Sequence, residues 1–400
     1  MTMTPRENFF TAMSHQQPER VLVDMGKHIG SIHKKAYVKL QQYLNDVPME
    51  NADKILDRMA QTVVPDEALL QRFGIDFRWL VPNWVQVKER TDVDGYIDMW
   101  GVPYRATADK DHYAIDVLCD APLKTATLNN LDDFNWPDPY DPDQFKGLRE
   151  QAESLYKNTD YVIGADAIKA GPLMTALQMR GYEQFFMDLI ADTEFADALL
   201  DKITWTLKAM WTRYMEEVGA YVQLAYVTDD LGSQTSMLIS PKVFRNRLKP
   251  KMKELYDHIK GLADVKLMMH TDGAVLPVIE DIIEMNVDII NPVQTSVQGM
   301  NNTQFLKQQF GNRLAFHGAI DVQHLMPNAN LNQLRWEVAK RIHDLSYNGG
   351  YIIAPCHNIG HDISSQNIVA FFDLVKEFDT DPSALDKVLA SKQSYFANHN

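Results

Sequence analysis

The chain has 400 residues, of which 45% are hydrophobic and 23% are charged, which is the composition of an ordinary folded protein. This length fits one large barrel or two medium-sized domains. Thirty-nine Lys and Arg residues against 54 Asp and Glu residues give a net charge of −15, which disfavours sequence-independent binding to nucleic-acid phosphates. We therefore expect no nucleic-acid partner.

Cysteine content and the start of the chain indicate the compartment. Cys119 and Cys356 are too few for a disulfide framework, so we predict no disulfide. The first ten residues lack the basic and apolar regions of a signal peptide. No apolar run reaches the roughly 18 residues that a membrane-spanning helix needs. We expect a cytoplasmic protein without a membrane association.

Strand-like and helix-like segments alternate from the start of the chain onward. Thr4, Pro5 and Glu7 form a capping box that predicts a helix through Met13. After it, short apolar runs end in polar residues and Gly, Pro or Asn, and a helical segment usually follows. Eight such runs are predicted as strands: 21–25, 75–80, 161–166, 223–230, 265–272, 287–293, 314–321 and 350–358.

This alternation predicts an α/β fold with a parallel sheet, and eight repeats fit a closed (β/α)8 barrel of the TIM type. A doubly wound sheet is the alternative, but the chain lacks both Gly-x-Gly-x-x-Gly after the first strand and a Gly-x-x-x-x-Gly-Lys loop. Residues 83–156 interrupt the alternation with turn signals and short strand-like pieces. We interpret them as an excursion beside the barrel mouth, within one domain that spans 1–400.

The carboxyl ends of the predicted strands are unusually polar. Because these ends meet at one mouth of a barrel, we expect their side chains to surround a single site. The polar residues at these ends are Asp24, Asp166, Asp229, Asp230, His270, Asp272, Asn291, Gln294, His317, Asp321, Cys356, His357 and Asn358.

His270 and Asp272 form the sharpest local pattern, because residues two apart on a strand project to the same face. With His357 from the last run they make a set of two imidazoles and a carboxylate, which suits zinc or another divalent first-row metal. Cys356 is a further candidate ligand. An Asp that orients a neutral His without a metal is the alternative.

Asp229, Asp230 and His317 are the candidate catalytic residues. Adjacent carboxylates in a closed mouth raise each other's pKa, so one of the two could exchange a proton near neutrality. They could equally hold a cationic substrate group, or cap the following helix or turn. His317 shares a strand face with Asp321, and its alternative is a core histidine bonded to the backbone.

Several segments resemble the uroporphyrinogen decarboxylase superfamily. They are Pro5-Arg6-Glu7, Pro18-Glu19-Arg20-Val21, Trp100-Gly101, Asp229-Asp230-Leu231-Gly232, His270-Thr271-Asp272-Gly273, Asn291-Pro292-Val293-Gln294, His317-Gly318-Ala319-Ile320-Asp321 and Ala354-Pro355-Cys356-His357-Asn358. The resemblance covers nearly the whole chain, and it implies a (β/α)8 barrel whose cleft lies at the C-terminal mouth.

The resemblance also distinguishes two branches. The decarboxylases need no cofactor and carry an Arg-Gln-Ala-Gly-Arg-Tyr signature, where this chain has residues 24–29, and a Phe-Ser-Asp-Ile-Leu segment that is unmatched here. The methyltransferases move methyl groups to or from corrinoid carriers with the help of zinc held by His-x-Cys and a distant Cys. His270 matches that histidine, Asp272 replaces the first Cys, and His357 replaces the second. Decarboxylases also have a histidine at this late position.

We therefore expect a metal-assisted methyltransferase that moves a methyl group from an O- or N-methylated small molecule to a reduced corrinoid on a partner protein. Two imidazoles and a carboxylate make a harder metal site than thiolates do, which favours an oxygen or nitrogen ligand. Trp84, Trp100 and Tyr104 could wall an aromatic pocket, which suggests methoxylated aromatic substrates. The predicted substrate-binding residues are Asp24, Lys27, His28, Arg78, Trp84, Asp166, Asn291, Gln294 and Asp321.

Two other functions stay open. One is a cofactor-free decarboxylase or other lyase, in which Asp and His act as acid and base while Lys27 and Arg78 hold a substrate carboxylate. The other is a barrel that binds a ligand without converting it. Whatever the function, an acidic surface with many exposed helices would suit a homodimer.

Overall fold

The computed structural model describes residues 2–108, 111–115 and 121–390, so Cys119 lies outside the described residues. Eight parallel strands form its central sheet, in the order β1-β15-β14-β13-β12-β11-β10-β5. They are β1 (Leu22–Val23), β5 (Phe77–Leu80), β10 (Val162–Ala165), β11 (Leu224–Thr228), β12 (Lys266–His270), β13 (Ile289–Asn291), β14 (Ala315–Ile320) and β15 (Tyr351–Pro355). Each predicted run contains one of these strands, which confirms the TIM-type α/β fold.

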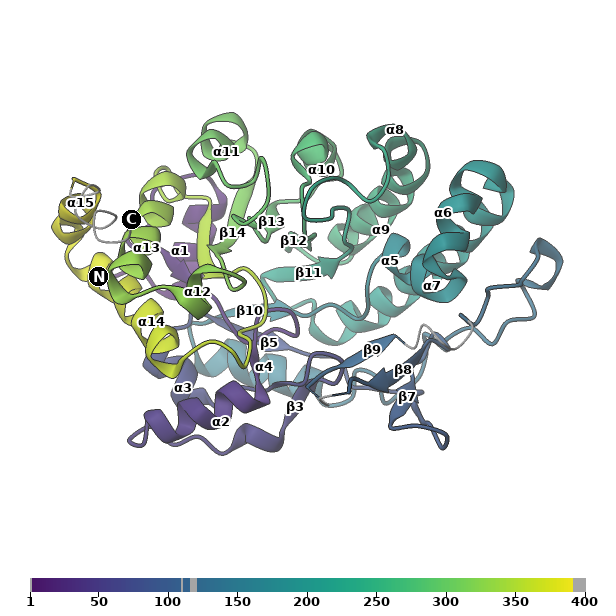
Figure 1. Ribbon diagram of the computed structural model, residues 1–400, viewed down its shortest axis with the longest axis horizontal. Helices are drawn as coiled ribbons and strands as arrows, with labels where there is room; N and C mark the ends of the chain where they lie inside the picture. Colours follow the sequence, from purple (N-terminus) through teal and green to yellow (C-terminus); the bar gives the residue numbers. More distant parts are fainter. Residues whose placement is uncertain (1, 109–110, 116–120, 391–400) are drawn as a thin grey trace.

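Helices surround the strands (Figure 1). They are α1 (Pro5–Met13), α2 (Lys34–Tyr43), α3 (Glu67–Phe73), α4 (Leu148–Asn158), α5 (Pro172–Arg180), α6 (Tyr182–Ala191), α7 (Thr193–Val218), α8 (Pro241–Val243), α9 (Lys249–Leu262), α10 (Ile279–Glu284), α11 (Thr303–Phe310), α12 (Leu325–Asn328), α13 (Leu331–Leu345), α14 (Ser365–Thr380) and α15 (Pro382–Ala390). The predicted capping box of α1 is present, with Glu7 N–H donating to the Thr4 side chain and Thr4 N–H to the Glu7 carboxylate. Among the described helices, none has the length and apolarity to cross a membrane.

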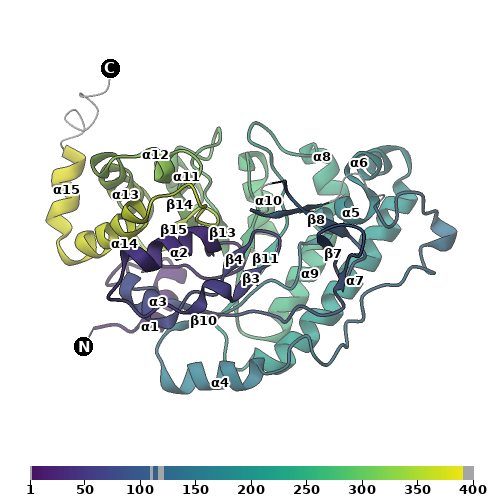
Figure 2. The same cartoon turned by 60° about the horizontal axis from the view of Figure 1, so that its bottom comes forward.

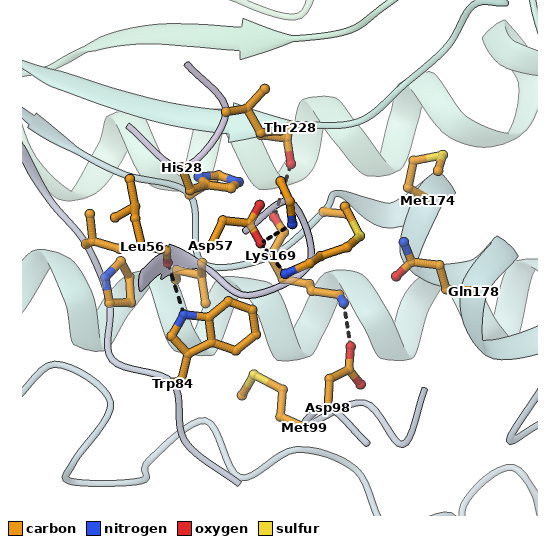
Figure 3. Close-up of a pocket in the computed structure, with 18 of the residues that line it drawn as sticks. His28, Leu56, Asp57, Trp84, Asp98, Met99, Lys169, Met174, Gln178 and Thr228 are labelled. Carbon is orange, nitrogen blue, oxygen red and sulfur yellow. Dashed lines mark hydrogen bonds and ion pairs between the residues drawn. The ribbon is translucent and has the colours of Figure 1, made fainter. Parts of the chain in front are cut away.

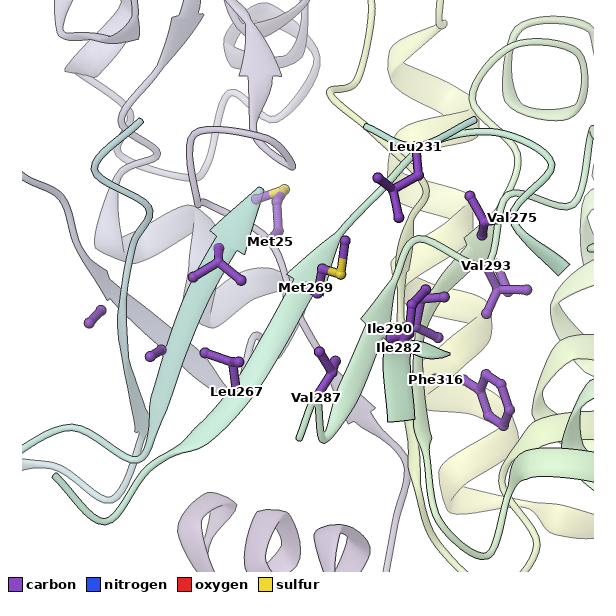
Figure 4. Packing of buried hydrophobic residues seen from close by; sticks show 14 of the residues in the cluster. Met25, Leu231, Leu267, Met269, Val275, Ile282, Val287, Ile290, Val293 and Phe316 are labelled. Atoms are coloured by element: carbon purple, nitrogen blue, oxygen red, sulfur yellow. The ribbon is translucent and has the colours of Figure 1, made fainter. Parts of the chain in front are cut away.

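Alternation along each strand sorts side chains between the barrel interior and the helices. One buried cluster fills the interior with Leu22, Phe77, Trp79, Val162, Leu224, Tyr226, Met268, Ile289, Ala315 and Ile352, and residues of α1 pack in the same cluster. Leu267 and Met269, the neighbours of Met268 on β12, belong to the larger cluster between the sheet and the helices (Figure 4). His270 therefore projects inward, because it lies two residues beyond Met268.

Two small antiparallel sheets lie outside the barrel. The first joins β2 (Ile32–His33), β4 (Thr62–Val63) and β3 (Ile55–Asp57) within the connection from β1 to β5. The second, within the predicted excursion, is made of β6 (Lys88–Glu89), β7 (Gly95–Ile97), β8 (Pro103–Ala106) and β9 (Tyr113–Ile115). Both views show β7 and β8 to one side of the barrel strands (Figures 1 and 2).

β1 and β5, the two ends of the sheet order, meet through Asp76. Its backbone N–H donates to the Val23 carbonyl at 2.9 Å, and its buried carboxylate accepts the Val23 N–H at 2.8 Å. The Arg20 guanidinium binds both carboxylate oxygens. Asp76 therefore links the two strands that the strand pairing alone leaves unjoined.

We predict that Asp76→Ala lowers the free energy of unfolding by about 2–3 kcal/mol, because it removes charge-assisted hydrogen bonds from the seam. Denaturation in urea, followed by circular dichroism, measures the change. Asp143→Ala is the matched control, since Asp143 forms an exposed ion pair with Lys146 and should cost at most about 0.5 kcal/mol. Equal losses in the two variants would show that Asp76 does not hold the seam.

Candidate active site

A cavity of about 270 Å³ lies where the carboxyl ends of the barrel strands converge. Loops that follow β1, β5, β10, β11 and β15 line it, together with His270 at the end of β12 and parts of the two small sheets (Figure 3). The predicted site residues in its wall are His28, Trp84, Asp229, Asp230, His270 and His357. A second cavity, of about 1170 Å³, shares His357, Asn358 and Gln178 with the first, so the two adjoin.

His270, Asp272 and His357 come together at this mouth. One ligand atom of each lies within 4.8 Å of the others. His270 Nε2 is 3.8 Å from Asp272 Oδ2, and the two imidazole ring centroids are 5.9 Å apart. Asp230 Oδ1 lies 3.7 Å from the same Nε2. The three residues that the sequence grouped are thus close enough to share one cation.

A buried carboxylate behind the cavity fixes the protonation of its neighbours. Asp24 accepts hydrogen bonds from Lys27 Nζ at 2.8 Å, Trp79 Nε1 at 2.9 Å and His317 Nε2 at 2.9 Å. Burial opposes ionisation of Asp24, but Lys27 and then His317 lower its pKa well below the usual range. Burial, followed by Lys27, lowers the pKa of His317 to about 4. His317 is therefore neutral, with its proton on Nε2.

Asn291 joins His317 to His270, at the mouth of the barrel, through two hydrogen bonds. His317 Nδ1 has no proton, so Asn291 Nδ2 donates to it at 2.7 Å. The other end of the amide, Oδ1, accepts the Tyr226 hydroxyl at 3.0 Å and His270 Nδ1 at 2.7 Å. With Nδ1 facing the Asn291 oxygen, His270 directs Nε2 toward Asp272, which is the orientation of a metal-ligating histidine.

None of Asp24, Lys27, Asn291 and His317 lines the cavity. These residues were predicted to bind substrate or, in the case of His317, to act in catalysis, and in this structure their side chains bond to one another behind the wall. Their interior position follows from alternation: Asn291 and His317 each lie two residues beyond an interior residue of their strand.

Asp166 also lies behind the wall and holds His28, which faces the cavity. Asp166 accepts the His28 backbone N–H at 2.8 Å and pairs with His28 Nδ1 at 2.7 Å. Burial alone would lower the pKa of His28, but the Asp166 carboxylate raises it above the ordinary value. Asp166 was also predicted to bind substrate, and the structure gives it this positioning contact instead.

Asp229 caps a helix and also lines the cavity, so it fits both the capping and the site interpretation of the acidic pair. Its carboxylate caps α5 by accepting the backbone N–H groups of Leu173 at 2.9 Å and Met174 at 2.8 Å, and it also lines the cavity. Burial raises the pKa of Asp229 to about 7, although the two backbone donors oppose the change. Asp230 accepts the Asp272 N–H at 3.0 Å. The cavity therefore contains one carboxyl that is partly protonated near neutrality.

Arg78 and Trp100 lie away from the cavity, contrary to prediction. Arg78 follows an interior residue on β5 and so points outward, where its Nε donates to Glu67 Oε2 at 2.7 Å. Trp100 is fully buried and packs edge-on against Trp136, at 6.4 Å between ring centroids. Neither is available to a ligand in the mouth.

Gln294, Asp321 and Cys356 are also absent from the cavity wall. Gln294 Oε1 accepts the Gly273 N–H at 2.7 Å, and Asp321 caps the turn after β14 by accepting the Gln323 N–H at 2.7 Å. The Cys356 thiol donates to a backbone carbonyl at 3.3 Å, and burial raises its pKa to about 12. The ligand atoms that lie close enough to share one ion are those of His270, Asp272 and His357, and Cys356 is not among them.

Other lining residues were missed in the sequence, among them Asp57, Asp98, Lys169, Gln144 and Gln178. Lys169 Nζ pairs with Asp98 Oδ2 at 2.5 Å, which ties the excursion to the barrel (Figure 3). The position of Lys169, three residues after Asp166, was a signal that could have identified it. The two glutamines and Asp57 follow no local pattern.

Comparisons with known proteins agree with this architecture. The family model described as uroporphyrinogen decarboxylase (URO-D) matches residues 120–378. A comparison with curated protein sequences found no match. Among solved structures, a methyltransferase from Methanosarcina mazei is similar over 94% of this chain and 99% of its own, with 16% identity and a TM-score of 0.65. At that identity the similarity concerns the fold.

Two further structures match less well. A B12-independent methionine synthase from Shewanella sp. W3-18-1 has 15% identity and a TM-score of 0.36, over 60% of this chain and 67% of its own. Xylanase 10B from Thermotoga maritima has 11% identity and a TM-score of 0.37, over 61% and 83%. The family match spans more than half of the chain, and this protein therefore belongs to the uroporphyrinogen decarboxylase family.

Proposed function

We propose that the protein is a metal-assisted methyltransferase that demethylates an O- or N-methylated small molecule and passes the methyl group to a corrinoid on a carrier protein. The observation that carries the proposal is the set of His270, Asp272 and His357, whose ligand atoms lie within 4.8 Å of one another. The cavity of about 270 Å³ beside this set suits a small substrate. The methyltransferase from Methanosarcina mazei shares the fold.

The donor set fits zinc or another divalent first-row metal. Imidazole and carboxylate are ordinary ligands of such ions, and three protein ligands leave an open position for substrate. When bound, the ion would act as a Lewis acid toward the oxygen or nitrogen atom that bears the methyl group. Asn291 orients His270 for this task, as outer hydrogen bonds do at other metal sites.

The acidic pair Asp229 and Asp230 is the source of the proton that the proposed reaction needs. In the proposed transfer, the bond between the methyl carbon and the substrate oxygen or nitrogen breaks, a new bond forms to the corrinoid acceptor, and the electron pair stays on the substrate. The leaving atom then needs a proton. Asp229 lines the cavity with a pKa near 7, so we assign it as the proton donor. Asp230 is held at the mouth by the Asp272 N–H.

The cations of this chain argue against a carboxylated substrate, which a decarboxylase would need to hold. Lys27 is bonded to Asp24 behind the wall, and Arg78 points out of the barrel. Lys169 is the one Lys or Arg among the described lining residues, and its ammonium pairs with Asp98. We therefore favour methyl transfer over decarboxylation.

The first prediction of this proposed function concerns metal content. Wild-type protein loaded with zinc and dialysed should retain it stoichiometrically, whereas His270→Ala and His357→Ala should lose it, because each removes one of three ligands. Elemental analysis by mass spectrometry measures this. His343→Ala is the control, since the His343 side chain is 53% exposed. Zinc retained by both ligand variants would exclude this metal site.

The second prediction concerns the hydrogen bond behind His270. Asn291→Ala should weaken zinc binding by about 10- to 100-fold, because Nδ1 of His270 loses the acceptor that fixes its tautomer. Competition with a chromogenic chelator measures the affinity. Tyr226→Phe removes another hydrogen bond to the same Asn291 oxygen and should leave the affinity within about threefold. An unchanged affinity in Asn291→Ala would show that the tautomer is set elsewhere.

The third prediction tests the reaction itself. Under anaerobic conditions, with chemically reduced cobalamin as acceptor, zinc-loaded protein should convert 2-methoxyphenol to catechol and methylated cobalamin, and His270→Ala should not. Absorbance changes of the cobalamin and chromatography of the catechol measure both products. Carbon dioxide released from a carboxylated substrate by metal-free protein would instead establish the lyase.

A further inference from the structure

Asp57 places a carboxylate with one unpaired oxygen in the wall of the cavity. The residue is the last of β3, and 6% of its surface is exposed. Its Oδ1 accepts the backbone N–H groups of Met59 at 2.7 Å and Ala60 at 3.3 Å, which fixes the side chain in the turn after β3. Its Oδ2 has no hydrogen-bond partner among the described residues. The carboxylate is therefore held in place through one oxygen only.

The unpaired oxygen is open to the cavity. Nine side-chain nitrogen and oxygen atoms of the described residues lack both a partner and accessible surface. Oδ2 of Asp57 is not one of these nine atoms, so it keeps surface that a ligand can touch. Asp57 lines the cavity of about 270 Å³ (Figure 3). A molecule in the cavity can therefore meet this oxygen directly.

The bases in the same wall already have acidic partners. Lys169 Nζ pairs with Asp98 Oδ2 at 2.5 Å, and His28 Nδ1 pairs with Asp166 Oδ1 at 2.7 Å. Neither base forms an ion pair with Asp57. Because a mostly buried carboxylate is costly without an opposite charge, Asp57 needs a cation that these side chains do not supply.

The neighbours of Asp57 do not supply that cation either. Arg58 follows it in sequence, but its guanidinium binds the two carboxylate oxygens of Glu89 at 2.5 Å and 2.6 Å and lies 4.3 Å from the centroid of the Tyr96 ring. Tyr96 and Tyr104 also line the cavity, and neither hydroxyl donates to Asp57. A hydroxyl is in any case a neutral donor, so it leaves the charge of the carboxylate unbalanced.

Carboxyl groups outnumber ammonium groups in the wall. Among the described residues, the lining side chains of these two kinds are Asp57, Asp98, Asp229, Asp230 and Lys169. Asp229 is partly protonated near neutrality, because burial raises its pKa to about 7. Asp230 Oδ1 lies 3.7 Å from His270 Nε2, so it belongs to the surroundings of the candidate metal set. Asp57 is thus the lining carboxylate that has neither a cation nor the metal set beside it.

We propose that Asp57 binds an ammonium group of the substrate, which makes the substrate a small methylated molecule with a protonated amine on a short side chain. This inference deepens the proposed function and rests on it, because the ligand is the methylated substrate of that site. The ammonium would donate a charge-assisted hydrogen bond to Oδ2. His270 and His357 line the same cavity, so the methylated atom and the ammonium are two different groups of one molecule.

Three probes of similar size and different charge test this by isothermal titration calorimetry, with the zinc-loaded protein and no corrinoid. 2-Methoxybenzylamine carries an ammonium, 2-methoxybenzyl alcohol carries a neutral hydroxyl, and 2-methoxybenzoate carries a carboxylate. We expect the amine to bind about 10- to 100-fold more tightly than the alcohol, because its hydrogen bond joins opposite charges. The benzoate should bind most weakly. Equal binding of the amine and the alcohol, or no binding of the amine, would overturn the inference.

A free amine can also coordinate zinc, so the series is repeated after zinc has been removed with EDTA. Asp57 is not a member of the candidate metal set. The preference for the amine over the alcohol should therefore remain within about threefold of its value in the zinc-loaded protein. A preference that disappears together with the zinc would assign the amine to the metal and refute the role of Asp57.

Asp57→Asn removes the charge but keeps an oxygen that can accept the N–H groups of Met59 and Ala60. The variant should bind the amine and the alcohol within about threefold of each other, and the alcohol as tightly as the wild type does. Asp57→Glu keeps the charge and should still prefer the amine. A structural role would weaken the binding of all three probes alike. An unchanged preference in Asp57→Asn contradicts the proposal, and if this variant does not fold, the wild-type series decides.

Asp257→Asn is the control for the loss of one negative charge, because Asp257 forms an exposed ion pair with Lys253 at 2.9 Å and does not line the cavity. It should leave the preference unchanged. The binding test needs no methyl transfer, so its outcome is separate from that of the proposed function. Methyl transfer to cobalamin without any preference for the amine would refute this inference alone. Amine-selective binding without transfer would refute the methyltransferase.

Discussion

The ionised carboxylate of Asp24 is the constraint on which the mouth of the barrel depends. A carboxylate can only accept hydrogen bonds, so the His317 nitrogen that faces it must carry the proton. Nδ1 of His317 is then an acceptor, so the Asn291 amide directs its nitrogen toward His317 and its oxygen toward His270. That oxygen accepts the proton on Nδ1 of His270. Each group along this path has one possible role once Asp24 is ionised. The orientation of the His270 ring is thus linked to a residue 246 positions earlier in the chain.

The barrel makes this long-range chain of contacts possible. Asp24 and His317 are 293 residues apart in sequence, but β1 and β14 both flank β15 in the sheet. Their side chains therefore meet across the interior layer. The seam at Asp76 completes that layer, because without it β1 would have a pairing partner on one side only. The mouth therefore rests on a ring whose seam is held by the backbone and side chain of Asp76 and by the hydrogen bond from Trp79 to Asp24.

Much of this arrangement could be predicted from local patterns. Apolar runs bounded by turn residues located all eight barrel strands, and two-residue periodicity placed His270 beside Asp272. The same periodicity would have rejected Arg78, which alternates with the interior residues Phe77 and Trp79. Gln144 and Lys169 could not be found in this way. Their place in the cavity depends on how the excursion packs against distant helices, and no short-range pattern encodes that packing.

Two kinds of structure form the wall of the cavity, namely strand ends of the barrel and the segment that follows β5. His270 and its hydrogen-bonded support lie at strand ends inside the barrel, where few side chains can move. Trp84, Gln144 and Asp98 come from the segment that follows β5, which contacts the barrel through the buried Lys169–Asp98 pair. Burial opposes the charge on Lys169, yet Asp98 raises the pKa of Lys169 above the ordinary value, so Lys169 keeps its charge. Because loops tolerate change better than strand ends do, substrate choice can vary in the excursion while the candidate metal set stays intact. Membership of the family therefore fixes the barrel, while the identity of any substrate of the proposed function depends on the cavity wall.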